Sequence, residues 1–308
     1  MVYAPIVLFV YNRPSHTKRT VEALKNNIFA KFSNLIIYSD GPKNFIDEEN
    51  VSTVRKYLSV ITGFKSIAVK KQKKNIGLAN SIISGVSTVI RTYGSVIVLE
   101  DDLVTSKYFL QFMNLALDKY KNKKQVISIH GYAYPFTGKN PETYFLKGAD
   151  CWGWGTWKRG WDLFETNGKK LLRTIQDRKL VNEFTLQGSY DYMSMLKNQI
   201  QGNIDSWAVR WLASAIVADK LTLYPGKSLV RNIGFDKSGV HCEKSETYSV
   251  GVSKFPVHVG NIAIEENQIM KQKLITFYRE HDRTSMLERS LNALLLEVRR
   301  SIEQMKGL

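Results

Sequence analysis

The chain has 308 residues, 44% of them hydrophobic, so it can bury a large core as one elaborated domain or as one domain with an appendage. Its formal net charge of +16 predicts attraction to an anionic partner such as a phosphate group, a membrane leaflet or a nucleic acid. Only two cysteines occur, Cys151 and Cys242, without metal-ligand spacing. This excludes a disulfide framework and favours a reducing, cytoplasmic setting.

The chain begins with an apolar segment, 6–10, that is too short and wrongly flanked to be a signal peptide. No apolar run approaches the length needed to span a bilayer. We therefore expect a soluble or peripheral protein in the cytoplasm, with the inner face of the membrane as the alternative location.

In chain order, the first third alternates between apolar runs typical of strands and segments typical of helices. Strands are expected at 5–11, 34–39, 66–70 and 95–99, helices at 15–26 and 47–59, and a loop followed by a helix at 75–90. This alternation predicts an α/β fold whose parallel sheet has helices on both faces.

After residue 103 the pattern is less regular. Helices are expected at 106–120, 169–182, 190–201 and 206–218, and a short strand at 126–130. A final amphipathic helix is expected at 284–305, with a stripe formed by Leu287, Leu291, Leu294, Leu295, Val298, Ile302 and Met305. Packing on protein is the expected use of this stripe, in the same chain or in a homodimer, and a peripheral membrane contact stays open.

Three consecutive acids, Glu100, Asp101 and Asp102, follow the apolar run 96–99. Adjacent carboxylates repel one another, so a bound cation would stabilise them. Oxygen ligands suit Mg²⁺ or Mn²⁺, which such sites usually share with a phosphate. Open α/β sheets bind ligands at the carboxyl ends of their strands, where these acids would lie. The alternative is a solvated turn after a strand.

Polar residues also follow the first two expected strands: Arg13 follows the first and Asp40 the second. In a parallel sheet these ends share one edge with the three acids. An arginine, an isolated acid and an acid cluster suit a base, a ribose and a metal-chelated diphosphate. The alternative is that both residues belong to surface turns.

With these motifs the chain resembles the GT-A class of nucleotide-sugar glycosyltransferases, in particular N-acetylglucosaminyltransferase I and its bacterial relatives, over roughly residues 5–242. The resemblance implies a GT-A, Rossmann-like, mostly parallel central sheet flanked by helices, with a C-terminal helical extension. We expect a catalytic domain at 1–250, with a nucleotide-binding half at 1–125 and an acceptor half at 126–250. The extension would span 251–308.

The resemblance also implies roles for the acidic and basic residues at the strand ends. Asp102 would contact Mn²⁺ or Mg²⁺ directly, and Glu100 and Asp101 would support the sugar nucleotide. Arg13 would help to hold uridine diphosphate, and Asp40 would read the uracil ring.

The segment 204–210 resembles the family segment in which an aspartate precedes a helix carrying a tryptophan and an arginine. This implies that Asp205 deprotonates the acceptor hydroxyl and that Arg210 contacts a phosphate. From its position alone, Asp205 is equally well the N-cap of the helix that follows.

Two further segments supply candidate donor contacts. The stretch 225–241 resembles the family loop that closes over the donor, so Arg231 and His241 are candidate diphosphate contacts. In 152–157, glycines alternate with tryptophans, and Trp154 is a candidate wall of the sugar site. Burial in the core is the alternative for this tryptophan.

These residues and the resemblance predict an inverting, metal-dependent glycosyltransferase. It would move a sugar from a nucleotide-sugar donor, with UDP as the expected nucleotide, to a hydroxyl of a glycan or lipid-linked acceptor. A sugar-1-phosphate nucleotidyltransferase is the enzymatic alternative, but such enzymes usually carry a glycine-rich loop after the first strand, and 11–15 has no glycine. A basic nucleic-acid-binding protein is the non-enzymatic alternative. It gives no use to three adjacent acids, so no nucleic acid is expected as a partner.

Overall fold

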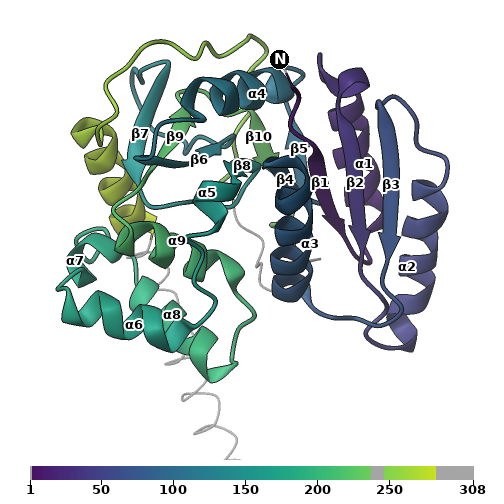
Figure 1. The fold of residues 1–308 in the computed structure, drawn as a ribbon, viewed down its shortest axis with the longest axis horizontal. Coiled ribbons are helices and arrows are strands. Elements are labelled where there is room, and N and C mark those ends of the chain that lie inside the picture. The colour runs from purple at the N-terminus through teal and green to yellow at the C-terminus, as the bar shows by residue number, and fades with distance from the viewer. Residues whose placement is uncertain (1, 237–245, 282–308) are drawn as a thin grey trace, which may run out of the picture.

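The computed structural model describes residues 2–236 and 246–281. Its centre is an eight-stranded sheet in the order β3-β2-β1-β4-β8-β6-β9-β7 (Figure 1). The first four strands in the chain are β1 (Ile6–Val10), β2 (Asn34–Ser39), β3 (Ser66–Lys71) and β4 (Ser95–Glu100). The others are β6 (Val126–His130), β7 (Thr143–Lys147), β8 (Trp154–Trp157) and β9 (Leu221–Pro225).

The strands β1, β2, β3 and β4 pair in parallel, and so do β6 and β9. The strand β8 pairs antiparallel with both β4 and β6, and β7 pairs antiparallel with β9. The sheet is therefore mostly parallel, because only β7 and β8 run against the other strands. A separate two-stranded ladder joins β5 (Leu103–Thr105) to β10 (Val230–Asn232).

Alternate residues of β1 enter different cores, as the period of a strand requires. Ile6 and Leu8 pack in the core that also holds residues of α1 (Pro14–Lys25), α2 (Phe45–Leu58) and α4 (Phe109–Tyr120). The opposite face, with Val7 and Phe9, packs against α3 (Leu78–Tyr93), α5 (Lys158–Trp161) and α9 (Trp207–Val217). Helices therefore cover both faces of the sheet, which confirms the expected α/β class.

Shorter helices complete the second half of the chain: α6 (Gly168–Asp177), α7 (Val181–Phe184) and α8 (Tyr192–Gln201), with a 3-10 turn, η1 (Ala30–Phe32), in the first half. The first three pack on α9 around a small core of their own, formed by Leu171, Ile175, Phe184, Leu196, Val209, Ala213 and Ile216. A last helix spans 268–281, and its Met270, Leu274, Phe277 and Tyr278 enter the main core.

The structure differs from expectation at the tryptophan-rich segment, which forms the central strand β8. Gly155 explains how it fits there, because a Cβ at this position would lie 2.9 Å from Met113 Cε and 3.0 Å from Val96 O. Strands β7 and β9 were also not expected. The amphipathic stripe at 287–305 lies outside the described residues, and the division into domains stays a prediction. Among the helices of the described part, none has the length and apolar character needed to cross a membrane.

Candidate active site

The three acids lie where β4 ends beside β1, since Glu100 pairs with Phe9 in the sheet. Arg13 Nη2 donates to Asp101 Oδ1 and, at 2.9 Å, to Asp102 Oδ2. The backbone of Asp101 is fixed as well, because Thr20 Oγ1 donates to its carbonyl at 2.8 Å. The structure therefore brings Arg13 and the acid cluster together at the carboxyl edge.

Burial disfavours the charged forms of these acids. It raises the pKa of Glu100 to about 8, with a further contribution from the charges of Asp102 and Asp101. Burial also raises the pKa of Asp101 to about 6, although the guanidinium of Arg13 counteracts part of this effect. A cation arriving at the cluster would relieve this repulsion and favour full ionisation.

The donor atoms near Asp102 suit a hard divalent cation that is shared with a ligand. Within residues 2–236 and 246–281, no group of three or more His, Cys, Asp and Glu side chains forms a metal cage. Gly234 packs against Asp102 Oδ2. A Cβ added to Gly234 would collide with that oxygen and would lie 3.2 Å from Asn232 Oδ1. Mg²⁺ and Mn²⁺ sites of this kind use one or two protein oxygens and complete their coordination with diphosphate and water. The Asp102 carboxylate and the Asn232 amide oxygen are donors of the type that these cations take, and the role of Asp102 as a metal ligand stays a prediction.

The segment that follows β10 lies against the acids. Ile233 N donates to the carbonyl of Asp102 at 2.9 Å, and His16 Nε2 lies 3.2 Å from Ile233 O and 3.1 Å from Asp236 Oδ2. Arg231 is exposed on β10, opposite Val104 of β5. Part of the expected donor loop thus borders the cluster, whereas His241 lies outside the described residues.

Asp40 is buried, and its carboxylate accepts three backbone hydrogen bonds. The donors are the N–H groups of Gly41 at 2.8 Å, Ile76 at 3.1 Å and Gly77 at 3.1 Å. Gly77, with a φ of 81°, is the residue before α3 and has no side chain to cap that helix. Asp40 therefore orders the turn at the start of α3, and its contact with uracil stays a prediction.

Asp205 also reaches the start of α3. Its Oδ2 accepts a hydrogen bond from Ala79 N at 3.3 Å, while the side chain is exposed. Ser206, and not Asp205, caps α9, because its hydroxyl accepts from Val209 N. The alternative that Asp205 is the N-cap of its own helix is therefore wrong.

Trp154 and Arg210 are held inside the protein. Trp154 is fully buried among Trp161, Trp207 and Trp211, so the prediction that it forms a wall of the sugar site is wrong. Trp154 belongs to the central strand β8, and helices cover the sheet on both faces there. Arg210 donates to the carbonyl oxygens of Thr166 at 3.0 Å and Ser206 at 3.4 Å. The phosphate contact of Arg210 stays a prediction.

A cavity of about 320 Å³ is lined by residues of the second half of the chain. Its lining includes nine aromatic side chains, those of Tyr134, Trp152, Phe184, Tyr190, Tyr192, Tyr224, Phe235, Tyr248 and Tyr278. Cys151 lines it too, and the pKa of its thiol is raised by burial and then by the charges of Asp150, Glu100 and Asp102. Ala208 and Val209, in the first turn of α9, line the cavity as well.

Asp150 is one of three carboxylates in the lining of this cavity, with Glu183 and Glu266, and it begins a chain of hydroxyl groups. Tyr134 donates to Asp150 Oδ2 at 2.7 Å, Tyr134 and Tyr278 hydroxyls lie 3.0 Å apart, and Tyr278 and Tyr192 hydroxyls lie 3.1 Å apart. Burial raises the pKa values of the three tyrosines well above their ordinary range. Sequence analysis missed these residues, because they come from three distant segments without a shared motif.

A buried ion-pair group closes another part of the cavity. Lys271 Nζ lies 2.8 Å from Glu183 and 2.9 Å from Glu266. Burial alone would lower the pKa of Lys271, but hydrogen bonds to both carboxylates raise it. This group ties the helix at 268–281 to the wall of the cavity.

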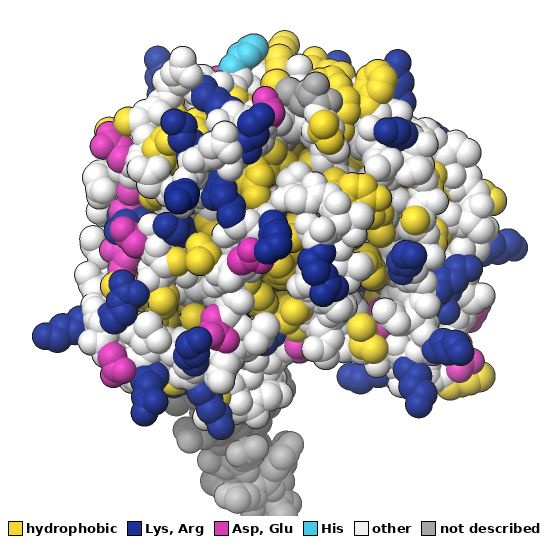
Figure 2. All heavy atoms as spheres, in the orientation of Figure 1, with side chains coloured by type: hydrophobic (Ala, Val, Ile, Leu, Met, Phe, Trp, Pro, Cys, Tyr) yellow, Lys and Arg dark blue, Asp and Glu magenta, His cyan; other side chains and the backbone are white. Residues whose placement is uncertain are grey.

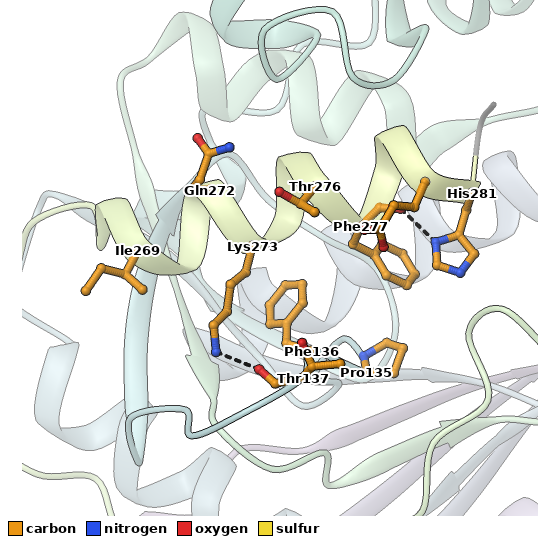
Figure 3. A pocket seen from close by; sticks show the side chains of 10 residues that line it. Pro135, Phe136, Thr137, Ile269, Gln272, Lys273, Thr276, Phe277 and His281 are labelled. Atoms are coloured by element: carbon orange, nitrogen blue, oxygen red, sulfur yellow. Dashed lines mark hydrogen bonds between the residues drawn. The ribbon is translucent and has the colours of Figure 1, made fainter.

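A second, larger hollow of about 620 Å³ lies between residues 135–137 and the helix at 268–281 (Figure 3). Phe136 and Phe277 form its apolar part, and Lys273 Nζ donates to Thr137 O at 2.9 Å across it. Its lining includes one carboxylate, that of Glu280, and none of the three acids that follow β4. None of these acids lines the smaller cavity either, but the charges of Glu100 and Asp102 act on the thiol of Cys151 in its lining, which associates the smaller, aromatic cavity with the acid cluster.

Comparison with known proteins finds no matching family model and no matching curated protein. Among solved structures, the chain is similar to the mannosyltransferase PcManGT from Pyrobaculum calidifontis in complex with GDP-Man and Mn²⁺. The identity is 13% and the TM-score 0.31, with 41% of this chain and 35% of that chain covered.

It is similar to S. aureus TarS at 13% identity and a TM-score of 0.31, with 44% of this chain and 23% of that chain covered. For TarS residues 1–349 the identity is 12% and the TM-score 0.31, over 47% of this chain and 42% of that one. The match spans less than half the length of each of these structures. Likenesses of this extent do not assign a function.

Proposed function

We propose that the protein transfers a sugar from a nucleotide-sugar donor, UDP-linked, to a hydroxyl group of a glycan or lipid-linked acceptor. The observation that carries this proposal is the position of the acid cluster. It lies at the carboxyl edge of a parallel sheet, with Arg13 against its carboxylates. Its charges also act on Cys151, which lines the aromatic cavity. A donor diphosphate would bind beside Arg13, and a sugar acceptor would bind in the aromatic cavity.

On the donor side, Asp102 would hold Mn²⁺ or Mg²⁺ together with the diphosphate, and the cation would neutralise charge on the leaving group. Arg13, whose guanidinium bonds to Asp101 and Asp102 in the structure, would help to hold the diphosphate. Asp40 orders the turn at 76–77 and would contact the uracil ring there. Arg231 faces solvent on β10, from where it would reach the diphosphate.

On the acceptor side, aromatic rings and a carboxylate form a surface that suits a sugar. Pyranose rings place their C–H faces on aromatic side chains and donate hydroxyl groups to carboxylates. Trp152 takes over the role expected of Trp154, because it is only partly buried and its ring lies 5.6 Å from that of Phe235 in the lining. Inside the cavity, the carboxylate of Asp150 accepts a hydrogen bond from the hydroxyl group of Tyr134.

Asp205 is the proposed base. It precedes α9, whose Ala208 and Val209 line the cavity, and its exposed carboxylate is free on one side to accept a proton. The acceptor oxygen forms a bond to the anomeric carbon while the bond from that carbon to the phosphate oxygen breaks. The hydroxyl proton passes to Asp205, and the nucleoside diphosphate leaves from the opposite face. This arrangement inverts the anomeric configuration.

Thermal stabilisation by UDP separates this function from the alternatives. We expect UDP to raise the melting temperature in Mn²⁺ and to raise it much less in a chelator, since metal and diphosphate bind together. A nucleotidyltransferase would instead form a sugar nucleotide from a nucleoside triphosphate and a sugar 1-phosphate. Binding to random DNA that weakens steeply with salt, without any effect of UDP and Mn²⁺, would identify a nucleic-acid-binding protein.

A further inference from the structure

An adjacent pair of apolar side chains projects into solvent at the start of α2. Phe45 is 84% exposed and Ile46 is 82% exposed. The helix packs on the core through a different stripe, formed by Val51, Val54 and Leu58. Packing of α2 therefore does not explain the pair. Single exposed apolar residues are common, but two neighbours with nearly full exposure indicate a surface that has a partner.

The loop that follows β3 is bonded to the segment that precedes this pair in the chain. Asn75 Nδ2 donates to Gly41 O at 2.9 Å, and Gln72 N donates to Ser39 O at 2.9 Å. Arg55 on α2 holds both segments, because its Nη2 donates to Gln72 O at 2.7 Å and to Asp40 O at 3.0 Å. The segments 39–41 and 72–75 are thus joined, and Lys43, Phe45 and Ile46 follow the first of them within five residues.

Lysines surround the apolar pair on this surface. Lys43, Lys71, Lys73 and Lys74 are all exposed, and the ion pairs of the described part of the chain involve none of them. Figure 2 shows Lys and Arg side chains along the lower right rim, over the ends of β2 and β3, with hydrophobic side chains among them. We call Lys43, Phe45, Ile46, Lys71, Lys73 and Lys74 the edge surface.

Acidic residues of α2 offset part of this charge. Asp47 accepts hydrogen bonds from Tyr11 Oη at 2.7 Å and Asn12 Nδ2 at 2.6 Å, so it faces the protein. Glu48 and Glu49 are exposed on the same helix. Against these two carboxylates stand the four lysines, and the whole chain has a net charge of +16.

We propose that the edge surface binds an anionic lipid membrane. Phe45 and Ile46 would enter the region between headgroups and acyl chains, and the lysines would contact the anionic headgroups. The edge surface borders Asp40, so docking would bring the carboxyl edge of the sheet close to the bilayer. This proposal goes beyond the proposed function and does not depend on transfer activity.

The two components of the edge surface distinguish a membrane from a nucleic acid. Lysines attract both partners, since both carry phosphates. Burial of an isoleucine beside a phenylalanine is favoured in an apolar phase. A membrane surface therefore uses both the lysines and the apolar pair, whereas binding to a nucleic acid backbone depends on the lysines.

Co-sedimentation of the full chain with vesicles tests the proposal. We expect binding at low salt to vesicles of phosphatidylcholine with phosphatidylglycerol and weak binding to phosphatidylcholine alone. Phe45→Ser combined with Ile46→Ser should weaken binding to the anionic vesicles by about tenfold or more. Lys73→Ser combined with Lys74→Ser should weaken it roughly 25-fold, since each lysine near an anionic surface contributes a factor of about five.

Two matched control variants change exposed residues away from the edge surface. The first is Val60→Ser, just beyond the opposite end of α2, where the side chain is 71% exposed. The second combines Lys123→Ser with Lys124→Ser, on another loop. Both should bind vesicles within about twofold of the parent chain. Equal losses in test and control variants would overturn the proposal, as would the absence of binding by the parent chain. If the variants keep the melting temperature and the UDP affinity of the parent chain, a loss of vesicle binding does not come from damage to the fold or to the donor site.

Discussion

Asp205 accepts a hydrogen bond from the backbone N–H of Ala79, 126 residues away in the sequence, at 3.3 Å. This contact brings the start of α9 to the start of α3. Asp40 holds the preceding residues of the same turn, since it accepts from Ile76 and Gly77. The proposed base and the proposed uracil contact are thus joined by one turn of backbone, and both belong to the carboxyl edge of the sheet.

Replacing Asp205 tests whether it is a base or only a partner for this turn. Asp205→Asn keeps the shape and an oxygen for Ala79 but removes the basic carboxylate. We expect transfer to fall by a factor of about 10² to 10⁴, with UDP affinity preserved. Kinetics with a saturating donor and calorimetry with UDP measure the two effects.

Ser206→Ala is the control for that variant, because Ser206 caps α9 and takes no part in proton transfer. It should lose about 1 kcal/mol of stability and keep its activity. Activity of Asp205→Asn within a few-fold of the parent protein would mean that Asp205 only supports the start of α3.

Replacing Asp102 tests the metal site. Asp102→Ala should abolish Mn²⁺-dependent binding of UDP and leave the fold intact, which titration calorimetry and a thermal melt measure. Gly234→Ala should weaken the same binding, because its Cβ would collide with Asp102 Oδ2. Gly260→Ala, where a Cβ meets nothing within 4 Å, should bind as the parent protein does. Undiminished metal-dependent affinity of Asp102→Ala would remove the acid cluster from the mechanism.

The pKa of Glu100, raised by burial to about 8 from an ordinary 4.5, predicts how stability depends on pH without metal. Between these values the folded state binds more protons than the unfolded state, so stability falls as pH rises from about 5 to 8. Thermal melts in a chelator measure this slope. Glu100→Gln cannot ionise at this position, so its stability should depend less on pH. Equal slopes of stability against pH in the two proteins would show that Glu100 does not cause the dependence.

Two neighbouring tryptophans should respond differently to truncation. Trp154→Ala opens a large void among Trp161, Trp207 and Trp211 and should cost about 3–5 kcal/mol of stability. Trp152→Ala removes a partly buried ring from the cavity and should chiefly raise the KM for the acceptor. Denaturant unfolding measures the loss of stability in each variant, and kinetics with varied acceptor measure the change in KM. The opposite pattern would return Trp154 to the sugar site.

The α/β class and the nearness of Arg13 to the three acids were predictable from sequence. Parallel strands bring their carboxyl ends to one edge, so residues that follow apolar runs meet there whatever their separation in the chain. The same argument could not place Trp154, because a tryptophan between glycines suits both a ligand surface and a buried strand. Only its pairing with β4 and β6 decides between these two environments.

The aromatic cavity was beyond sequence analysis for a different reason. Tyr134, Tyr192 and Tyr278 share a hydroxyl chain that ends at Asp150, yet no periodicity or spacing connects them. The partner of Asp205 was equally hidden, since a carboxylate before a helix usually caps that helix. Here Ser206 is the cap, which leaves Asp205 to contact α3.

The release of nucleoside diphosphate from a panel of sugar nucleotides tests the central claim most directly. The full chain is incubated with Mn²⁺ and each of UDP-glucose, UDP-galactose, UDP-N-acetylglucosamine and GDP-mannose, with and without a mixture of glycan acceptors. We expect release of UDP from at least one donor, stimulated by acceptor, lost in a chelator and lost in Asp102→Ala. Release that is unaffected by the chelator and by Asp102→Ala, or no release from any donor, would contradict the account.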